Sequence, residues 1–513
     1  MLFFLANNWY ISLYKKRDKG KTKNFTNIII NLLYTKFTYT VMQNLVHTSY
    51  NSQNQAITIF KTVKLVMVTA ANNNKYYEMK QLSDDIFSVS YGRVGQREAI
   101  NEYSMYQWES KYREKVRKGY KDVTHLFREE LEKKLSKNNS VNSNYQNSLA
   151  SWSAIKNGEV RELFRHLTQY SQRSLSHNYK VSAADVTMLQ VEEAQNILNN
   201  LTKKVDFKSN KISKKDLENF DTISFNAFLL ELYSIIPRKM ESVQNYLLEY
   251  TAGKIVSKQI LERARKLLTS EQETLDVMRG EVELRLQQEK KNNLKNNVEV
   301  DTDKTEKQEE KTLLDALGIE VTILDEKKSK DAVQIKSIKK MMQDEVGKFV
   351  NAYSIKDIAQ EQIFAKNLKD SKYRTTELFW HGSRNENWLS ILKTGLVLRP
   401  TNALITGKMF GYGLYFADKC RKALNYTSLR GSYWTAGNEN KAFLAIYEVH
   451  TGRQLKIEKY ENWCGGLTYE NLKKQNSEAD SLFAKGGFDL INNEFIVYKE
   501  NQCTLRYLVE VHY

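Results

Sequence analysis

The spacing of hydrophobic and polar residues changes several times along the chain, and each change predicts a different kind of element. Between about residues 57 and 127, apolar runs at residues 63–68, 76–82 and 86–95 are separated by turns that contain Asn, Asp or Ser, which is typical of strands. Residues 100–119 then mix Tyr, Trp and Val with Lys and Arg at helical spacing. We expect a small β-rich domain that ends in a helix.

Residues 150–285 show the period of helices instead. One predicted helical face is formed by four apolar residues, Val191, Ala194, Leu198 and Leu201. The run FLLELYSII repeats this pattern, and Pro237 ends it because proline lacks the N–H that a helix interior needs. We expect an all-α helical bundle over this stretch.

Three segments show neither pattern. Residues 128–149 are rich in Asn and Ser, and residues 286–311 are charged and repetitive, so both predict linkers. Residues 1–56 hold two apolar runs that are each too short to cross a bilayer, and their first Lys and Arg residues follow the first run instead of preceding it as in a signal peptide. We expect a poorly ordered N-terminal extension, with an amphipathic membrane contact as the alternative.

The last segment, residues 312–513, mixes both patterns. Residues 321–324 predict a strand and residues 332–349 a helix. Residues 443–449 are almost continuously apolar, which is typical of a strand buried on both faces, and apolar residues alternate near the C-terminal end. The chain as a whole is therefore predicted to be a multidomain α+β protein.

Composition narrows the class of protein. The chain has 513 residues, enough for three or four domains, and 78 Lys and Arg against 61 Asp and Glu give a formal net charge of +17. A basic chain suits a polyanionic partner such as nucleic acid. The alternative is a compositional bias toward Lys and Asn, which the presence of only two prolines also fits.

The cysteines exclude two further classes. Cys420, Cys464 and Cys503 lie far apart in the sequence and form no C-x-x-C pair. This spacing argues against a disulfide framework and against a zinc finger, and it suits a reducing compartment.

Three short motifs carry the candidate chemistry. LFWHGSR places His381 at the end of an apolar strand and follows it with a glycine, so a ring nitrogen and a bare backbone can face one ligand. TGKMFGYGLYFAD contains Tyr415, and NEFIVY contains Glu494. Taken singly, such residues are more often a solvated histidine, a core tyrosine and an acid at a strand edge. Gly411 and Gly413 do not form a dinucleotide-binding turn, because the third glycine is missing and no helix opens after a strand.

Together with KALNY, the motifs resemble the catalytic signature of the poly(ADP-ribose) polymerase family, the diphtheria-toxin-like ADP-ribosyltransferases, in order and spacing over about residues 310–513. The resemblance implies a catalytic His-Tyr-Glu triad at His381, Tyr415 and Glu494 and a mixed, mostly antiparallel fold with a split sheet. It also implies cleavage of the nicotinamide–ribose bond of NAD+ and transfer of ADP-ribose to an acceptor, with no metal. Because the transition state resembles an oxocarbenium ion, Glu494 would stabilise the developing positive charge and hydrogen-bond the ribose 2′-hydroxyl.

The resemblance also assigns residues that would hold NAD+. Tyr415 and Tyr426 match two tyrosines that stack on nicotinamide, and the backbone of Gly382 would bind its carboxamide. The remaining matches are His381 and Ser383 at the adenosine ribose, and Lys422 near the nicotinamide ribose and the acceptor.

One position departs from the family pattern. A serine that bonds the nicotinamide amide usually stands three residues before the second stacking tyrosine, and this chain has Ala423 there. One hydrogen bond contributes about 0.5–1.5 kcal/mol. We therefore expect weaker NAD+ binding and not inactivity.

The β-rich segment resembles a WGR domain, a DNA-binding module found beside this catalytic domain, on the stretches NNNKYY and YGRVG. Tyr91 stands in place of the signature tryptophan and can still stack on a sugar or base, and Arg93 can pair with a phosphate. Further phosphate contacts, nearly independent of sequence, would come from Lys111, Arg113, Lys115 and Lys118. A purely structural β-domain is the alternative.

The stretch FLLELYSIIPRK loosely resembles the end of a helix in the family's helical regulatory domain, which restrains the NAD+ site until DNA binds. A generic helical bundle is the alternative.

These expectations combine into an NAD+ ADP-ribosyltransferase that DNA ends or nicks stimulate and that makes poly(ADP-ribose) on itself and on other proteins. Glu494 favours polymer, since family members that stop at one unit often lack this glutamate. Mono-ADP-ribosylation with the same DNA trigger is the first alternative, and a catalytically silent scaffold that binds DNA ends is the second. The DNA role implies a nuclear location and no membrane partner, and the oligomeric state stays open.

Overall fold

The computed structural model describes residues 49–50, 56–57, 61–127, 152–180, 185–205, 214–249, 256–296, 312–398 and 409–513. The chain divides into two compact units, residues 1–61 and 62–513. In the first unit, β1 (Ser49–Tyr50) pairs with β2 (Ala56–Ile57) in antiparallel orientation. The rest of the predicted N-terminal extension and the predicted linker at 128–149 lie outside the described residues.

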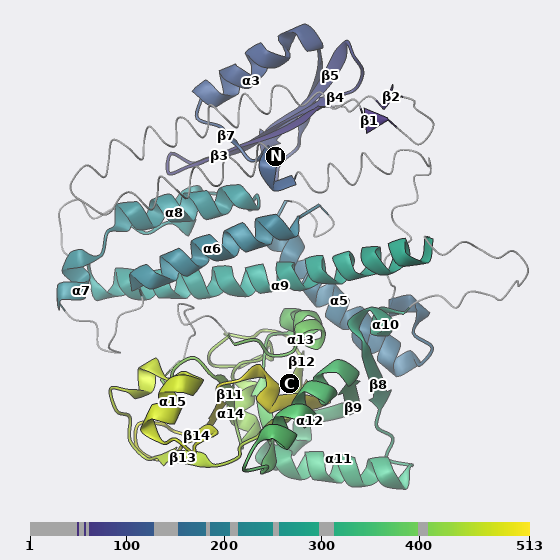
Figure 1. The fold of residues 1–513 in the computed structure, drawn as a ribbon, viewed down its shortest axis with the longest axis vertical. Coiled ribbons are helices and arrows are strands. Elements are labelled where there is room, and N and C mark those ends of the chain that lie inside the picture. The colour runs from purple at the N-terminus through teal and green to yellow at the C-terminus, as the bar shows by residue number, and fades with distance from the viewer. Residues whose placement is uncertain are drawn as a thin grey trace, which may run out of the picture. The chain divides into compact units, whose positions relative to one another are not determined.

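The second unit begins with a five-stranded antiparallel sheet. Its order is β6 (Ala99–Ser104), β5 (Ile86–Arg93), β4 (Asn73–Gln81), β3 (Thr62–Thr69) and β7 (Lys121–Asp122). The helix α3 (Trp108–Arg117) begins by packing Trp108 edge-on against Phe87 of β5, with ring centroids 4.9 Å apart. Figure 1 shows α3 beside this sheet.

The three strands expected in this segment are confirmed, but the helix predicted at 100–119 is wrong over its first five residues. There the chain forms β6, which pairs with the open edge of β5, and Tyr103 packs on Phe87 at 5.7 Å. A strand edge supplies backbone hydrogen-bond partners that sequence spacing does not reveal, and this tertiary pairing overrides the local helical pattern.

The middle of the unit is helical. Its helices are α5 (Gly158–Asn178), α6 (Met188–Val205), α7 (Lys214–Asn219), α8 (Thr222–Ile235) and α9 (Lys258–Asn296). The helix α6 packs against α8 and α9, and Figure 1 shows the three side by side. The predicted apolar face of α6 is buried, and α8 ends two residues before Pro237, as the sequence predicts.

The linker predicted at 286–311 is wrong over its first eleven residues, because α9 continues to Asn296. Gln, Glu, Lys and Leu all have high helix propensity, so a solvated helix can continue where the apolar stripe ends. Residues 297–311 lie outside the described residues.

In the described part of the last segment, residues 312–513, the strands form two sheets. The larger has the order β10 (Thr376–Gly382), β12 (Lys441–His450), β16 (Cys503–His512), β9 (Phe349–Asp357) and β8 (Ile319–Ile323), with all pairs antiparallel. The smaller has the order β11 (Leu414–Phe416), β15 (Glu494–Val497), β14 (Ser481–Ala484) and β13 (Gln454–Ile457), and only its β13–β14 pair is parallel. Two hydrogen bonds of 2.8 and 2.9 Å between Trp380 and Ala417 join the sheets. This is the mixed, mostly antiparallel arrangement that was expected.

Among the described residues of this segment, α10 (Leu313–Leu317) precedes β8, and the helices between the later strands are α11 (Ser329–Met342), α12 (Ile358–Asp370), α13 (Trp388–Thr394), α14 (Cys420–Leu424) and α15 (Tyr469–Gln475). The helix predicted at 332–349 begins at Ser329 and ends at Met342, where Gln343 takes a positive φ of 53°. A 3₁₀ turn over Gln343–Lys348 then leads into β9.

One hydrophobic core joins the helical segment to the catalytic sheets. Phe164 and Leu167 of α5 and Leu284 of α9 belong to the same buried cluster as Phe379 of β10 and Trp388 of α13. Burying a large apolar side chain contributes about 1.5–3 kcal/mol, so the two segments stabilise each other. The helical segment and residues 312–513 therefore share one core and do not pack as separate domains.

The three cysteines are buried and unpaired. Among the described helices, none is long and apolar enough to cross a membrane.

Candidate active site

Three strands bring His381, Tyr415 and Glu494 together. The strand β10 ends just after His381, β11 carries Tyr415, and β15 begins with Glu494. The strand β11 lies between the other two, since it meets β10 at the Trp380–Ala417 bridge and pairs with β15 along its length. Tyr415 is opposite Ile496, two residues from Glu494, and His381 follows Trp380, the partner of Ala417, so the three predicted triad residues lie close together on adjacent strands.

The His381 ring is oriented by the backbone of β11. Its Nδ1 lies 3.1 Å from the carbonyl oxygen of Tyr415, and a carbonyl only accepts, so Nδ1 carries the proton. Burial lowers the pKa of His381 more than this hydrogen bond raises it, which favours the neutral ring. Nε2 is then an acceptor for a hydroxyl. Nearby, the Ser383 hydroxyl accepts a hydrogen bond from Asn387 Nδ2 at 3.0 Å.

Gly382 lies directly against α14. A Cβ at this position would be 2.8 Å from the carbonyl carbon of Ala423 and closer still to its oxygen, so glycine is required by the neighbouring backbone. This differs from the expected reason, which was room for a ligand. The backbone of Gly382 still points away from β12, because Trp380 directs its own N–H and C=O to Ala417 and alternate residues of a strand share a side.

The two candidate stacking tyrosines are held from different directions. The Tyr415 hydroxyl donates to the carbonyl of Gly411 at 2.8 Å and accepts from the N–H of Phe410 at 3.1 Å. Tyr426 follows α14 and stacks on Trp434, with centroids 6.3 Å apart and planes at 26°. Both rings are fixed by groups of this chain, and Trp434 covers one face of Tyr426.

Glu494 forms a largely buried ion pair with Lys422. Nζ and Oε1 are 2.5 Å apart, the side chains are 12% and 13% exposed, and Nζ also donates to the carbonyl of Asn493 at 2.7 Å. Burial raises the pKa of Glu494, and the positive charge of Lys422 opposes this rise. Burial lowers the pKa of Lys422, and the negative charge of Glu494 opposes this fall. Burial is the main cause that raises the pKa of Tyr426 to about 12 and also raises the pKa of Tyr415. The negative charge of Glu494 raises both pKa values further. The register places Glu494 two residues from Ile496, the partner of Tyr415, and its ion pair holds it to Lys422 of α14, the helix just before Tyr426.

Sequence reasoning missed the residues that fix the turn before Glu494. Asn493 Nδ2 donates to Asp418 Oδ2 at 2.7 Å, and Asn493 Oδ1 accepts from the N–H of Gly486 at 2.9 Å. Asp418 is the last residue of the motif TGKMFGYGLYFAD, and Asn493 is the first residue of NEFIVY. Their presence in these two motifs could have identified them from the sequence.

The helix α9 touches the loop and helix that follow Gly382. Glu273 pairs with Arg384 at 3.5 Å, and the Ser390 hydroxyl donates to the carbonyl of Asp276 at 3.3 Å. A Cβ on Gly280 would be 2.6 Å from the Cβ of Ser390, so α9 and α13 are in close backbone contact. The helical segment therefore packs directly beside the candidate NAD+ site.

Some of the predicted DNA-binding residues gather around the aromatic side chains beneath α3. Lys115 Nζ lies 4.3 Å from the ring centre of Tyr77, and the Tyr91 ring is 5.9 Å from that of Tyr77. Lys111 Nζ lies 4.2 Å from the ring centre of Tyr103. Tyr91, Lys111 and Lys115 are therefore brought together.

The other basic candidates have different surroundings. On α3 and its C-cap, Arg113 pairs with Glu109 at 2.7 Å and Lys118 pairs with Glu114 at 2.5 Å. Such exposed pairs contribute about 0–1 kcal/mol, so they leave both cations able to exchange partners.

Arg93 bonds within the chain. Its Nη1 donates to the carbonyl of Asn72 at 2.8 Å, and its Nη2 donates to the carbonyls of Met240 at 3.2 Å and Glu241 at 2.8 Å. These bonds connect β5 to the segment after α8. A DNA phosphate would have to compete with them.

In the part of the chain that the structure describes, no group of three or more His, Cys, Asp or Glu side chains is placed to hold a metal ion.

Comparison with known proteins gives one family. A model described as the poly(ADP-ribose) polymerase catalytic domain matches residues 329–513. The putative poly [ADP-ribose] polymerase-like 100L of Invertebrate iridescent virus 6 is 31% identical over 194 residues, which cover 37% of this chain and 99% of that protein. Uncharacterized protein 101L of the same virus is 33% identical over 235 residues, covering 45% of this chain and 83% of that protein.

A cellular relative shows the same match over a smaller share of its length. Poly [ADP-ribose] polymerase 2 of Homo sapiens is 29% identical over 187 residues, 32% of this chain and 30% of that protein. The fold of residues 312–513, the site formed by His381, Tyr415 and Glu494, and these matches together define an NAD+ ADP-ribosyltransferase. The chain belongs to the poly(ADP-ribose) polymerase family, whose enzymes use NAD+ as substrate.

Proposed function

We propose that this transferase is stimulated by DNA ends or nicks and builds poly(ADP-ribose) on itself and on DNA-bound proteins. The observation that carries the proposal is the position of the Glu494 carboxylate, which is paired with Lys422 and lies near both Tyr415 and Tyr426. A negative charge beside two aromatic rings suits a ligand whose flat ring leaves as positive charge develops on the neighbouring sugar.

The residues present fit NAD+ as substrate. Nicotinamide would lie between Tyr415 and the face of Tyr426 that Trp434 does not cover, and its carboxamide would bond the N–H and C=O of Gly382. His381 Nε2 would accept a hydrogen bond from a hydroxyl of the adenosine ribose, because Nδ1 already donates to the carbonyl of Tyr415.

The reaction breaks the bond between the nicotinamide nitrogen and C1′ of the ribose, and the bonding electrons leave with nicotinamide. Glu494 stabilises the positive charge that develops on the sugar. The acceptor oxygen then bonds to C1′, and its proton passes to solvent water. When the acceptor is a ribose hydroxyl of an earlier unit, Glu494 accepts a hydrogen bond from it, and the chain grows. Lys422 fixes the carboxylate for both roles.

A chain of contacts supports regulation by DNA. Arg93 of the five-stranded sheet bonds the carbonyls of Met240 and Glu241 after α8. Just before them, Arg238 forms a buried ion pair of 3.0 Å with Glu271 of α9. Two residues along α9, Glu273 pairs with Arg384 beside the candidate NAD+ site. DNA would raise activity by favouring a state in which α9 no longer restrains that site.

The direct test of this proposal is labelling with NAD+. The full chain is incubated with labelled NAD+ with and without nicked 5′-phosphorylated DNA, and the products are resolved on a gel. A DNA-dependent smear is expected. A single sharp band would indicate mono-ADP-ribosylation instead of polymer. Labelling without DNA would contradict the restraint by α9. Absence of any labelling would favour the alternative of a catalytically silent scaffold that binds DNA ends.

Restraint by α9 has its own test in the full chain, because a fragment from residue 300 onward would expose the shared hydrophobic core. Gly280→Ala places a methyl against Ser390 and should push α9 from α13, which raises the activity without DNA. Gly158→Ala is the matched control, because this helical glycine has only the end of the Arg161 side chain within 4.0 Å. Equal activity of both variants without DNA would contradict the restraint.

A DNA partner implies action in the nucleus, and localisation of the tagged full chain would check this part of the proposal.

A further inference from the structure

A second polar site lies apart from the candidate active site. A cleft of about 620 Å³ opens between the end of α12, the segment that follows it, and α15. This volume is typical of sites for small molecules. The charged residues that line the cleft are Lys366, Lys372, Lys473 and Lys499 together with Asp370, Glu478 and Asp480.

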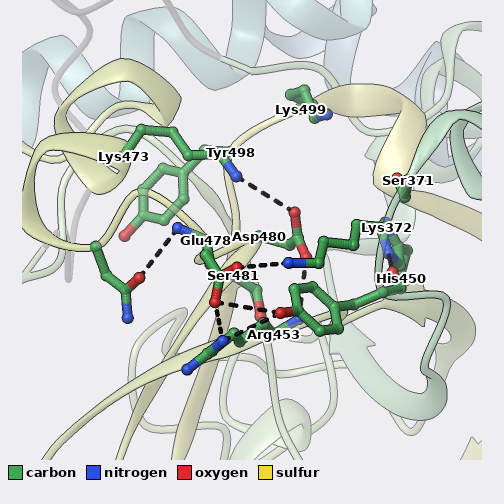
Figure 2. Close-up of polar contacts among 12 residues, drawn as sticks. Ser371, Lys372, His450, Arg453, Lys473, Glu478, Asp480, Ser481, Tyr498 and Lys499 are labelled. Carbon is green, nitrogen blue, oxygen red and sulfur yellow. Dashed lines mark hydrogen bonds and ion pairs between the residues drawn. The ribbon is translucent and has the colours of Figure 1, made fainter.

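Two of the four lysines are paired with carboxylates. Lys372 lies 2.6 Å from Glu478, and Lys473 lies 3.5 Å from Asp480. Figure 2 shows these side chains, with Arg453 also reaching Glu478. The two acids at this edge of the cleft are thus already neutralised by cations of the chain.

The other two lysines leave positive charge in the cleft. Within the described residues, neither Lys366 nor Lys499 has a carboxylate at ion-pair distance. Lys499 Nζ instead lies 4.3 Å from the ring centre of Tyr469, which also lines the cleft. Two cations and an aromatic ring therefore face the same space.

The floor of the cleft is ordered and offers an acceptor. Asn367 donates to Nδ1 of the buried His450 at 2.9 Å, and His450 Nε2 therefore donates to the carbonyl of Tyr373 at 2.6 Å. Asn501 lines the cleft, and its Oδ1 is buried without a hydrogen-bond partner among the described residues. A ligand hydroxyl or amine that reaches this oxygen would supply the missing hydrogen bond.

The cleft and Glu494 lie near opposite ends of one strand pair. Along β14 and β15, Ser481 is opposite Val497 and Ala484 is opposite Glu494. Asp480, which lines the cleft, directly precedes Ser481. The four residue steps from Asp480 to Ala484 span about 13 Å of strand, so a product formed at Glu494 is within short reach of the cleft.

We propose that this cleft binds an ADP-ribose unit of the product. Lys366 and Lys499 would contact the diphosphate, and Asn501 would accept a hydrogen bond from a ribose hydroxyl or the adenine amine. A long polyanion such as DNA fits less well, because the cleft of about 620 Å³ has the volume of a site for one small molecule. The source of the ligand rests on the proposed function, and the binding site itself rests on these contacts.

The test measures ADP-ribose binding to the full chain carrying Glu494→Gln, so that nothing turns over. Calorimetry is done with a saturating non-hydrolysable NAD+ analogue, which occupies the site at Tyr415. One equivalent of ADP-ribose should bind per chain, and inorganic pyrophosphate should compete with it. The double change Lys366→Ala/Lys499→Ala should weaken binding at least about tenfold.

The matched control is Lys336→Ala/Lys340→Ala, which removes the same charge from exposed positions of α11 and should leave binding unchanged. Lys499→Arg keeps the charge and should keep binding, which separates lost charge from misfolding. Absence of binding, or equal weakening in both double variants, overturns the proposal. Displacement by nicked DNA but not by pyrophosphate assigns the cleft to nucleic acid and also overturns it. Failure of the analogue to bind, while ADP-ribose still binds through Lys366 and Lys499, would refute the proposed NAD+ site and leave the cleft standing.

Discussion

Replacing Gly382 with alanine should distort the candidate active site through one methyl group. The new Cβ would lie 2.8 Å from the carbonyl carbon of Ala423, whereas two carbon atoms in contact are comfortable at about 3.5 Å. The carbonyl must therefore retreat by at least about 0.7 Å, the difference between these distances, and by more to clear its oxygen. Overpacking of this kind costs about 1–3 kcal/mol.

The retreat would also move α14, which carries Lys422 and leads to Tyr426. A displacement of about 1 Å of groups that position a substrate can lower a rate about 100-fold. We expect Gly382→Ala to lose about 1–3 kcal/mol of unfolding free energy in urea and to lose kcat/KM for NAD+ by a larger factor than its stability explains.

The control is Gly347→Ala, because a Cβ at Gly347 has nothing within 4 Å and its backbone is not in the positive-φ region. That variant should keep both stability and activity. If Gly382→Ala unfolded at the same urea concentration as the native chain and kept the same kcat/KM, the close packing of β10 against α14 would not matter for the site.

Three further changes test other contacts. Activity needs ionised Glu494, so kcat/KM should fall as the pH drops through the pKa of this residue. Lys422→Met removes the cation that opposes the effect of burial on this pKa, so the acid limb of kcat/KM should move to higher pH. Lys422→Arg keeps the cation and should leave the acid limb in place. Ala423→Ser should lower KM for NAD+ about 2- to 10-fold, since one hydrogen bond contributes about 0.5–1.5 kcal/mol, and an unchanged KM would count against the missing serine. Arg93→Ala removes charged hydrogen bonds to three carbonyls and should cost about 1–3 kcal/mol of stability and weaken binding to nicked DNA. Unchanged affinity for that DNA would refute a phosphate role for Arg93.

The catalytic segment could be predicted from the sequence because each of its key strands has a strong local pattern. The apolar run before His381 and the continuous run in β12 form the strands that they predict, and the motifs place Tyr415 and Glu494 next to identifiable elements. Local pattern and tertiary environment agree there, which is the condition under which sequence reasoning works.

The failures occur where long-range contacts decide. Residues 99–104 form a strand because β5 has an open edge, and no local pattern shows that edge. Arg93 has the composition of a phosphate ligand, yet its guanidinium bonds carbonyls about 150 residues away in sequence, at Met240 and Glu241. Gly382 was singled out as a ligand contact, and in the fold the group that leaves no room for a side chain there is the carbonyl of Ala423.

The central claim is that Glu494 performs the transfer of ADP-ribose at the site formed with His381 and Tyr415. The measurement that tests it most directly compares the native chain with Glu494→Gln in the presence of nicked DNA and labelled NAD+, following nicotinamide release and product length together. The amide keeps the size of the side chain but removes the charge, so transfer should fall at least about 100-fold and the polymer should disappear. Polymer of native length made at the native rate by Glu494→Gln would contradict the account.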